Sequence, residues 1–131
     1  MRRYLLDTCA LIWVFQNNKR IGDIAEDIEY FQGDYAVSVD SVKELLYLLQ
    51  SGKLRMDFSF ETMMTTLQKK NISVYAFDQG ALKALSELPF FKSHPDPTDR
   101  CIIAMAISDN RTLITGDRKF IQYPKLKILL I

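Results

Sequence analysis

The sequence predicts an α/β fold, in which a mostly parallel central sheet of four or five short strands is flanked by helices. Segments of three to five β-forming residues alternate along the chain with longer segments whose apolar residues recur at helical spacing. This alternation is typical of parallel sheets. A length of 131 residues with 48% hydrophobic content is enough for one buried core, so we expect a single domain over residues 1–131.

The expected strands are short runs that combine apolar and β-branched residues. The first, Tyr4-Leu5-Leu6, ends at Asp7, and the second, Tyr35 to Val39, is rich in β-forming residues. Shorter runs with the same character predict the others. The five expected strands cover residues 4–6, 35–39, 72–75, 112–115 and 127–131.

The expected helices are defined by apolar spacing and by residues that stop a helix. Asp40-Ser41 can cap one helix and Ser51-Gly52 can end it, while Gly33 follows the helix before. Three prolines at positions 89, 95 and 97 separate the last two helices. The final helix is apolar on nearly all sides, which indicates burial. The expected helices cover residues 8–15, 21–31, 42–50, 60–70, 78–88 and 98–108.

The composition narrows the possible functions. The formal net charge is only +1, so the chain lacks the basic excess that usually marks a nucleic-acid binder, and binding would depend on a local site. Two distant cysteines, Cys9 and Cys101, indicate neither a disulfide scaffold nor, with a lone histidine, a zinc site. Asp7 interrupts the apolar start of the chain, and no run approaches the roughly 20 apolar residues of a membrane span. We therefore expect a cytoplasmic protein.

Four acidic residues are expected at one edge of the sheet. Asp7 directly follows the first strand, and Asp117 follows the strand that ends at Thr115. Glu44 lies one turn into the helix after the second strand, and Asp99 lies in the first turn of the buried helix. Because ligands of open parallel sheets bind beyond the carboxyl ends of the strands, these positions predict a binding site.

Each acid also has an ordinary structural interpretation. Asp7 or Asp117 can serve as a helix N-cap, and Ser41-x-x-Glu44 matches a capping box. Asp99 can complement the positive end of a helix dipole. Four carboxylates that converge, however, repel one another unless a cation neutralises them. Carboxylate ligands suit Mg²⁺ and Mn²⁺, which assist phosphoryl chemistry.

Four stretches of the chain resemble the PIN-domain ribonucleases, and among them the VapC-type toxins of toxin–antitoxin pairs. They are YLLDTCALIW at 4–13, SVDSVKELLYLLQSGKL at 38–54, HPDPTDRCIIAMA at 94–106 and LITGDRKFIQY at 113–123. The resemblance implies a PIN-like fold over the whole chain. It also implies that RNA phosphodiester bonds are hydrolysed by a water that Mg²⁺ or Mn²⁺ activates. A small antitoxin would block this activity, and the chain would form a homodimer.

The resemblance also implies roles for particular residues. The metal-binding acids of the family correspond to Asp7, Glu44, Asp99 and Asp117, and Thr115 is similar to a hydroxyl residue that assists such sites. Two positions depart from the family pattern. Thr98 stands where phenylalanine is usual, so we expect the packing of the Asp99 turn to differ. Cys9 stands where histidine or asparagine is common, which would alter a contact with Asp7 or RNA.

Several interpretations remain open from the sequence alone. Asp96, between two prolines, is interpreted as a turn former. His94 can assist proton transfer, but a lone histidine in a loop is more often solvated. Arg100, which adjoins Asp99, can contact phosphate or form a structural ion pair with a carboxylate. A receiver-like Mg²⁺-dependent phosphoacceptor would also cluster acids at strand ends, but it needs a lysine at the end of a late strand. A catalytically silent PIN-fold module that only binds partners is the other alternative.

Overall fold

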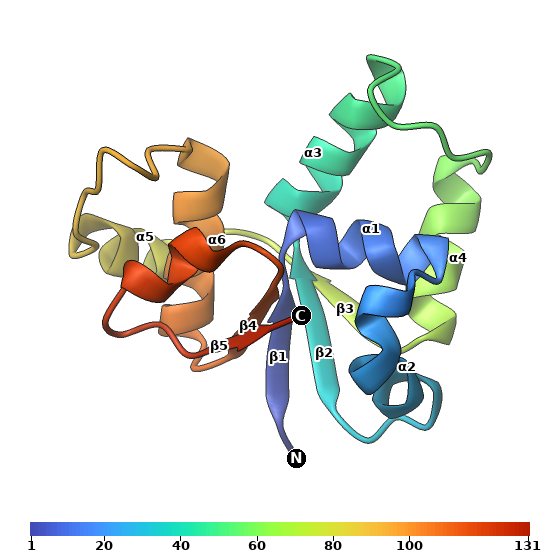
Figure 1. Cartoon of the computed structure of the whole chain (residues 1–131), viewed down its shortest axis with the longest axis horizontal. Helices are drawn as coiled ribbons and strands as arrows, with labels where there is room; N and C mark the ends of the chain where they lie inside the picture. The colour runs from blue at the N-terminus through green and yellow to red at the C-terminus, as the bar shows by residue number, and fades with distance from the viewer.

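A parallel five-stranded sheet forms the centre of the molecule (Figure 1). The computed structural model describes residues 1–131. The strand order is β3-β2-β1-β4-β5, and every neighbouring pair is parallel. The predicted α/β fold with a parallel sheet is therefore confirmed. The strands are β1 Arg3–Leu6, β2 Asp34–Ser38, β3 Ile72–Tyr75, β4 Thr112–Thr115 and β5 Ile128–Leu130.

Helices connect the strands and cover both faces of the sheet. None of them combines the length and the apolar character that a bilayer span requires. The two short 3₁₀ helices, η1 and η2, were not expected from the sequence. The helices are α1 Thr8–Gln16, η1 Lys19–Ile21, α2 Gly22–Glu29, α3 Val39–Gln50, α4 Phe60–Lys69, α5 Gln79–Ser86, α6 Pro97–Ser108 and η2 Arg118–Gln122.

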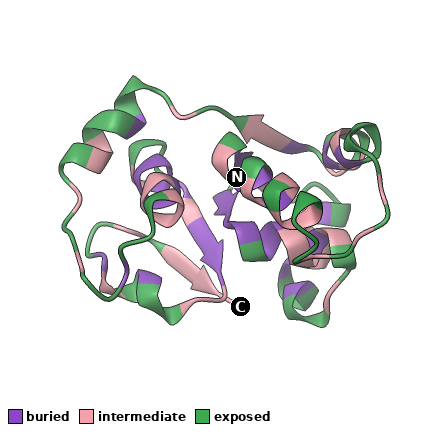
Figure 2. Cartoon of the chain, turned by 90° about the horizontal axis from the view of Figure 1, so that it is seen from above, coloured by how far each residue is buried: buried purple, intermediate pink, exposed green.

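The core consists of two layers, one on each side of the sheet. Alternate strand residues face opposite sides. Leu6 packs in the layer formed with α1, α2, α3 and α4, whereas Leu5 packs in the layer formed with α5, α6 and η2. Buried residues gather in the strands and on the helix sides that face them (Figure 2). Helix α6 contributes five buried residues, which confirms its predicted burial.

The chain reverses its direction across the sheet between β1 and β4. From β1 it builds outward through β2 and β3, and it then returns to place β4 on the other side of β1. In open α/β sheets, ligands usually bind beyond the carboxyl ends of the strands at such a switch point. The backbone N–H of Asp7 donates to the carbonyl of Ile114 over 3.1 Å, which fixes the end of β1 to the end of β4.

The predicted end of the second helix is wrong. The helix expected to reach Phe31 ends at Glu29, and Phe31 itself adopts the left-handed conformation with φ 55°. Gly33 therefore does not stop the helix. It instead allows the Tyr35 ring to pack closely, because a Cβ at Gly33 would lie 2.7 Å from that ring.

The predicted capping box at the start of α3 is also wrong. Ser38 is the N-cap, and its hydroxyl accepts a hydrogen bond of 2.8 Å from the N–H of Asp40. The helix thus begins before Ser41, whose buried hydroxyl has no hydrogen-bond partner. Glu44 consequently has no capping role, and its side chain is available for other contacts.

Candidate metal centre

Asp7 lies at the carboxyl end of β1 and is almost completely buried, with 4% of its surface exposed. Its carboxylate accepts a hydrogen bond of 2.8 Å from the N–H of Ala10, so it is the N-cap of α1. Burial raises its pKa to about 6, and the charges of Asp99 and Asp117 add to this increase, although Thr115 and Ala10 oppose it. The capping interpretation of Asp7 is thus correct. The charged form of this N-cap is nevertheless disfavoured by burial and by the carboxylates of Asp99 and Asp117.

Thr115 and Asp117 lie at the carboxyl end of β4. The fully buried Thr115 hydroxyl accepts a hydrogen bond of 3.0 Å from the N–H of Asp117, and it also favours the charged form of Asp7. Asp117 is the N-cap of η2, where it accepts a hydrogen bond of 2.9 Å from the N–H of Lys119. Thr115 therefore interacts with two of the predicted acids.

Asp99 lies in the first turn of α6. The N-cap of this helix is Asp96, which accepts a hydrogen bond of 3.0 Å from the N–H of Asp99. Asp96 is therefore occupied by a structural role. Burial raises the pKa of Asp99, and the charges of Asp96 and Asp117 raise it further, whereas His94 opposes the shift.

Glu44 is half-buried on α3 and contacts α1. Its carboxylate accepts a hydrogen bond of 3.0 Å from the hydroxyl of Thr8. Burial raises the pKa of Glu44, while the Thr8 bond lowers it and the charges of Asp99 and Asp96 raise it. Glu44 therefore lies within electrostatic range of Asp99.

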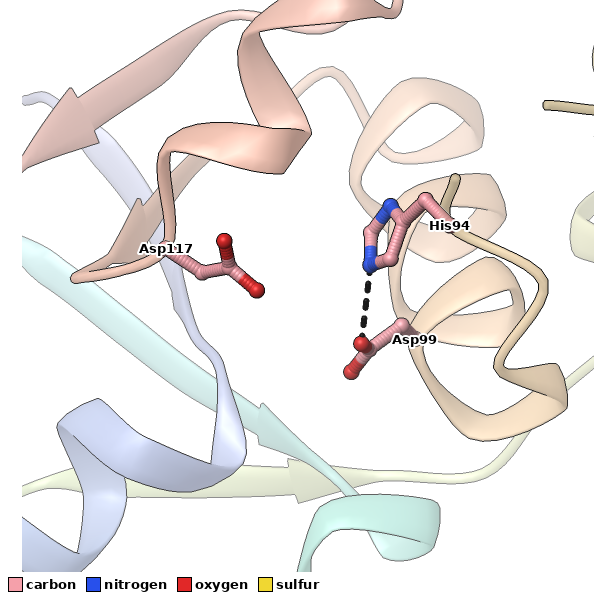
Figure 3. Close-up of side chains that lie close together, drawn as sticks. All are labelled: His94, Asp99 and Asp117. Atoms are coloured by element: carbon pink, nitrogen blue, oxygen red, sulfur yellow. Dashed lines mark hydrogen bonds and ion pairs between the residues drawn. The ribbon is translucent and has the colours of Figure 1, made fainter. Parts of the chain in front are cut away.

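Not all of the predicted ligands come equally close. Potential ligand atoms of His94, Asp99 and Asp117 lie within 4.8 Å of one another (Figure 3). Asp7 and Glu44 are not part of this inner group. The Cys9 thiol nevertheless indicates that the acids surround one region. Burial raises its pKa to about 11, with further contributions from all four carboxylates: Asp7, Glu44, Asp99 and Asp117.

His94 was not identified as a site residue from the sequence, and the expectation that it is solvated was wrong. It is only 3% exposed, and its Nε2 lies 2.9 Å from Oδ2 of Asp99. Aromatic rings enclose it, because its ring packs edge-on against Phe120 and Tyr123. The nearby Phe91 is the one local signal for this burial, since an aromatic residue in a loop needs a packing partner.

Arg100 forms no ion pair with a carboxylate, so the structural ion pair suggested by the sequence is wrong. Its guanidinium donates a hydrogen bond of 2.8 Å to the carbonyl of Pro89 and lies 5.2 Å from the centre of the Phe90 ring. The phosphate contact remains a prediction.

A second polar region differs from this centre in its electrostatics. Arg3, Tyr75 and Arg111 line a cavity of about 340 Å³ on the face of the sheet that carries α5 and α6. Burial alone would raise the pKa of Asp109 there, but hydrogen bonds and charges from Arg111 and Arg3 lower it. The charge of Asp109 is thus already balanced by arginines, and its pKa is lowered. In the candidate metal centre, by contrast, the pKa values of Asp7, Glu44 and Asp99 are raised.

The fold and the arrangement of acids define an α/β protein with carboxylates beyond the ends of its two central strands. A family model described as PIN domain matches residues 4–126, and the chain belongs to this family. This confirms the family to which the four sequence stretches pointed. No curated protein sequence matches the chain.

Solved structures with the same fold include toxin–antitoxin proteins. VapBC2 from Rickettsia felis, bound to a fragment of its promoter DNA, matches with a TM-score of 0.74 and 18% identity over 97% of each chain. DNA-bound VapBC from Salmonella typhimurium matches with a TM-score of 0.69 and 17% identity over 98% of each chain. A toxin–antitoxin complex from Klebsiella pneumoniae has a TM-score of 0.64 and 16% identity, over 96% of this chain and 95% of that chain.

The donor atoms of the centre fit a hard divalent cation. Carboxylate oxygens are the preferred ligands of Mg²⁺ and Mn²⁺. Burial, together with the neighbouring carboxylates, raises the pKa values of Asp7, Glu44 and Asp99 and so disfavours their charged forms, which a nearby positive charge would favour. A cation would supply it.

Proposed function

We propose that this chain is a metal-dependent endoribonuclease that hydrolyses RNA phosphodiester bonds. The observation that carries the proposal is the group of buried or half-buried carboxylates at the switch point, in which burial and neighbouring carboxylates raise the pKa values of Asp7 and Asp99. Membership of the PIN-domain family supports it. Mg²⁺ or Mn²⁺ is the proposed cofactor.

The proposed roles differ among the residues. Asp99 and Asp117 would hold the cation directly, because their oxygens lie in the inner group of donors. Asp7 would complete the site from the end of β1, and Glu44 from α3. Thr115 would orient both Asp7 and Asp117. When bound, a divalent ion activates water and stabilises negative charge on a phosphate.

The test is cleavage of single-stranded RNA by the purified protein. We expect cleavage in Mg²⁺ or Mn²⁺, loss of cleavage in EDTA, and a decrease of at least about 100-fold for Asp99→Asn and Asp117→Asn, a typical loss for a group that stabilises charge in the transition state.

The matched control is Asp78→Asn. Asp78 is the N-cap of α5 and accepts a hydrogen bond of 2.9 Å from the N–H of Ala81, so this variant makes the same chemical change at an equivalent cap outside the centre. It should cleave at the wild-type rate. A wild-type protein that binds metal but cleaves no RNA would favour the catalytically silent binding module.

We further propose that the chain is the toxin of a toxin–antitoxin pair, bound by a small antitoxin and active as a homodimer. The fold shared with the VapBC proteins supports this. Two large side chains on α3 and α4, Tyr47 and Phe60, are more than half exposed and offer apolar contacts to a partner. Co-expression with a small protein encoded beside this gene should yield a stable complex and suppress growth arrest; growth arrest that persists would contradict the proposal.

A further inference from the structure

Backbone hydrogen bonds and two aromatic rings fix the position of His94. Its backbone N–H donates to the carbonyl of Phe91 over 3.0 Å, and its own carbonyl accepts from the hydroxyl of Tyr123 over 3.3 Å. The centre of its ring lies 4.8 Å from that of Phe120 and 5.6 Å from that of Tyr123. The imidazole therefore has one fixed orientation, with Nε2 directed at Asp99 (Figure 3).

The 2.9 Å contact joins Nε2 of His94 to Oδ2 of Asp99. An ionised carboxylate only accepts hydrogen bonds, so toward the charged form of Asp99 the imidazole acts as the donor. The bond engages Oδ2 of Asp99 and leaves Oδ1 without a protein partner. Donation from a rigid group thus selects which oxygen of Asp99 remains available.

His94 also connects the two inner carboxylates. Asp99 belongs to α6, whereas Asp117 is the N-cap of η2. The ring of His94 donates to Asp99 and packs against Phe120, which lies within η2. A shift of the imidazole would therefore change the position of Asp99 relative to Asp117.

We propose that His94 is a positioning residue, which holds the carboxylate of Asp99 opposite Asp117 in the geometry that a divalent cation requires. This inference rests on the proposed metal centre. Hydrogen-bonded partners of metal ligands commonly affect metal affinity by about 10- to 100-fold.

The surroundings of the ring favour this role over direct ligation. A metal-binding histidine almost always donates its other ring N–H to an acceptor. The Nδ1 of His94 is buried and has no partner. The structure therefore offers no acceptor for a hydrogen on Nδ1, and the second hydrogen bond that a metal-binding histidine usually makes is missing here.

Two amide substitutions separate positioning from packing. The amide nitrogen of glutamine can replace Nε2, whereas that of asparagine corresponds to Nδ1 and does not reach Asp99. Both changes remove the ring. We expect His94→Gln to bind Mn²⁺ within about 3-fold of wild type, and His94→Asn to lose about 10- to 100-fold in affinity, as measured by calorimetry on the metal-free protein. Equal affinities for the two variants would overturn the proposal.

His94→Phe keeps an aromatic ring against Phe120 without a donor. It should unfold in urea close to the wild-type midpoint and still show the reduced Mn²⁺ affinity. Wild-type affinity in a folded His94→Phe protein would also overturn the proposal. This variant keeps the test valid if His94→Asn does not fold.

Nuclear magnetic resonance gives a readout independent of activity. The chain contains a single histidine, so its ring nitrogens are assigned without ambiguity. We expect Nε2 to remain protonated when Mg²⁺ is added. Loss of that proton would show direct ligation and overturn the positioning role. If the wild-type protein binds Mn²⁺ with the expected dependence on position 94 but cleaves no RNA, the proposed function fails while this inference stands.

Discussion

The hydroxyl of Thr8 donates a hydrogen bond of 3.0 Å to the carboxylate of Glu44, and this bond joins α1 to α3 at the edge of the acid cluster. Thr8 directly follows Asp7, and it is nearly buried. Two consecutive residues therefore serve the cluster: Asp7 contributes its own carboxylate, and Thr8 holds that of Glu44.

Thr8→Val should weaken metal binding without disrupting the fold. The substitution keeps the shape of the side chain but removes the donor, and because that hydrogen bond lowers the pKa of Glu44, its loss should raise this pKa further. We expect Mn²⁺ affinity to fall about 10-fold. Thr66→Val, which removes a hydroxyl bonded within α4, is the control and should bind as wild type. An unchanged affinity in Thr8→Val would argue against Glu44 as part of the centre.

Asp7→Asn should stabilise the metal-free protein at neutral pH. The carboxyl pKa rises from 3.8 to about 6 in the folded state, so folding favours the protonated form. Stability from this group is complete below pH 4 and is lost as the pH rises through 6. The cost at pH 7 is up to about 3 kcal/mol. Asparagine remains neutral and is an equally good N-cap.

The measurement is urea unfolding in EDTA at pH 4, 5, 6 and 7. Wild type should lose stability across this range from the Asp7 contribution, while Asp7→Asn should show a flatter profile. Asp78→Asn, at the N-cap of α5, should follow the wild-type profile. If Asp7→Asn is less stable than wild type at pH 7, burial does not raise the pKa of Asp7 as expected.

Gly116 lies between Thr115 and Asp117, and the ring of Trp13 packs directly on it. A Cβ at this position would overlap the end of the indole and would approach Cζ3 of Trp13 to 2.9 Å. Gly116→Ala should therefore cost about 1–3 kcal/mol through overpacking. In a Trp13→Phe background the smaller ring leaves room, so the cost should shrink. A double-mutant cycle on urea unfolding measures this coupling; equal costs in both backgrounds would contradict the contact.

Arg111 should matter for stability but not for metal binding. It is almost fully buried, and its guanidinium donates to the carbonyls of Tyr4 and Asp34 and to the carboxylate of Asp109. Arg111→Met would remove these hydrogen bonds, while Arg3 would still pair with Asp109, and we expect a loss of about 2–4 kcal/mol in unfolding free energy. Mn²⁺ affinity should remain within 2-fold of wild type. A large decrease would show that this region communicates with the acids.

The features that depend on local pattern could be predicted from the sequence. The strands over 72–75 and 112–115 and the helix from Phe60 were identified nearly residue by residue, because each is a short run with a clear period. Asp7 and Asp117 were placed at one edge of the sheet by a general rule of parallel topology. Asp99 followed from the helix start after the prolines.

The features that depend on packing between distant parts of the chain could not be predicted from the sequence. His94 is buried by Phe120 and Tyr123, which lie more than 25 residues away along the chain, so apart from Phe91 nothing beside it indicates that its ring is enclosed. The start of α3 was misplaced because both Ser38 and Ser41 can cap a helix, and only the length of the paired strand decides between them. The 3₁₀ turn at η2 is too short to show a period.

The strand order also affects when the proposed centre can form during protein synthesis. Asp7 and Asp117 are 110 residues apart in the sequence, yet β1 and β4 are neighbours in the sheet. A growing chain emerges from its N-terminus, and its early strands can pair before β4 has been translated. At that stage Asp7 and Glu44 lack Thr115 and Asp117 as neighbours, so the proposed centre is incomplete. Under the proposed function, an unfinished polypeptide that has not yet added β4 would leave the RNA around the ribosome intact, and hydrolysis would begin only after the late strands have joined the sheet.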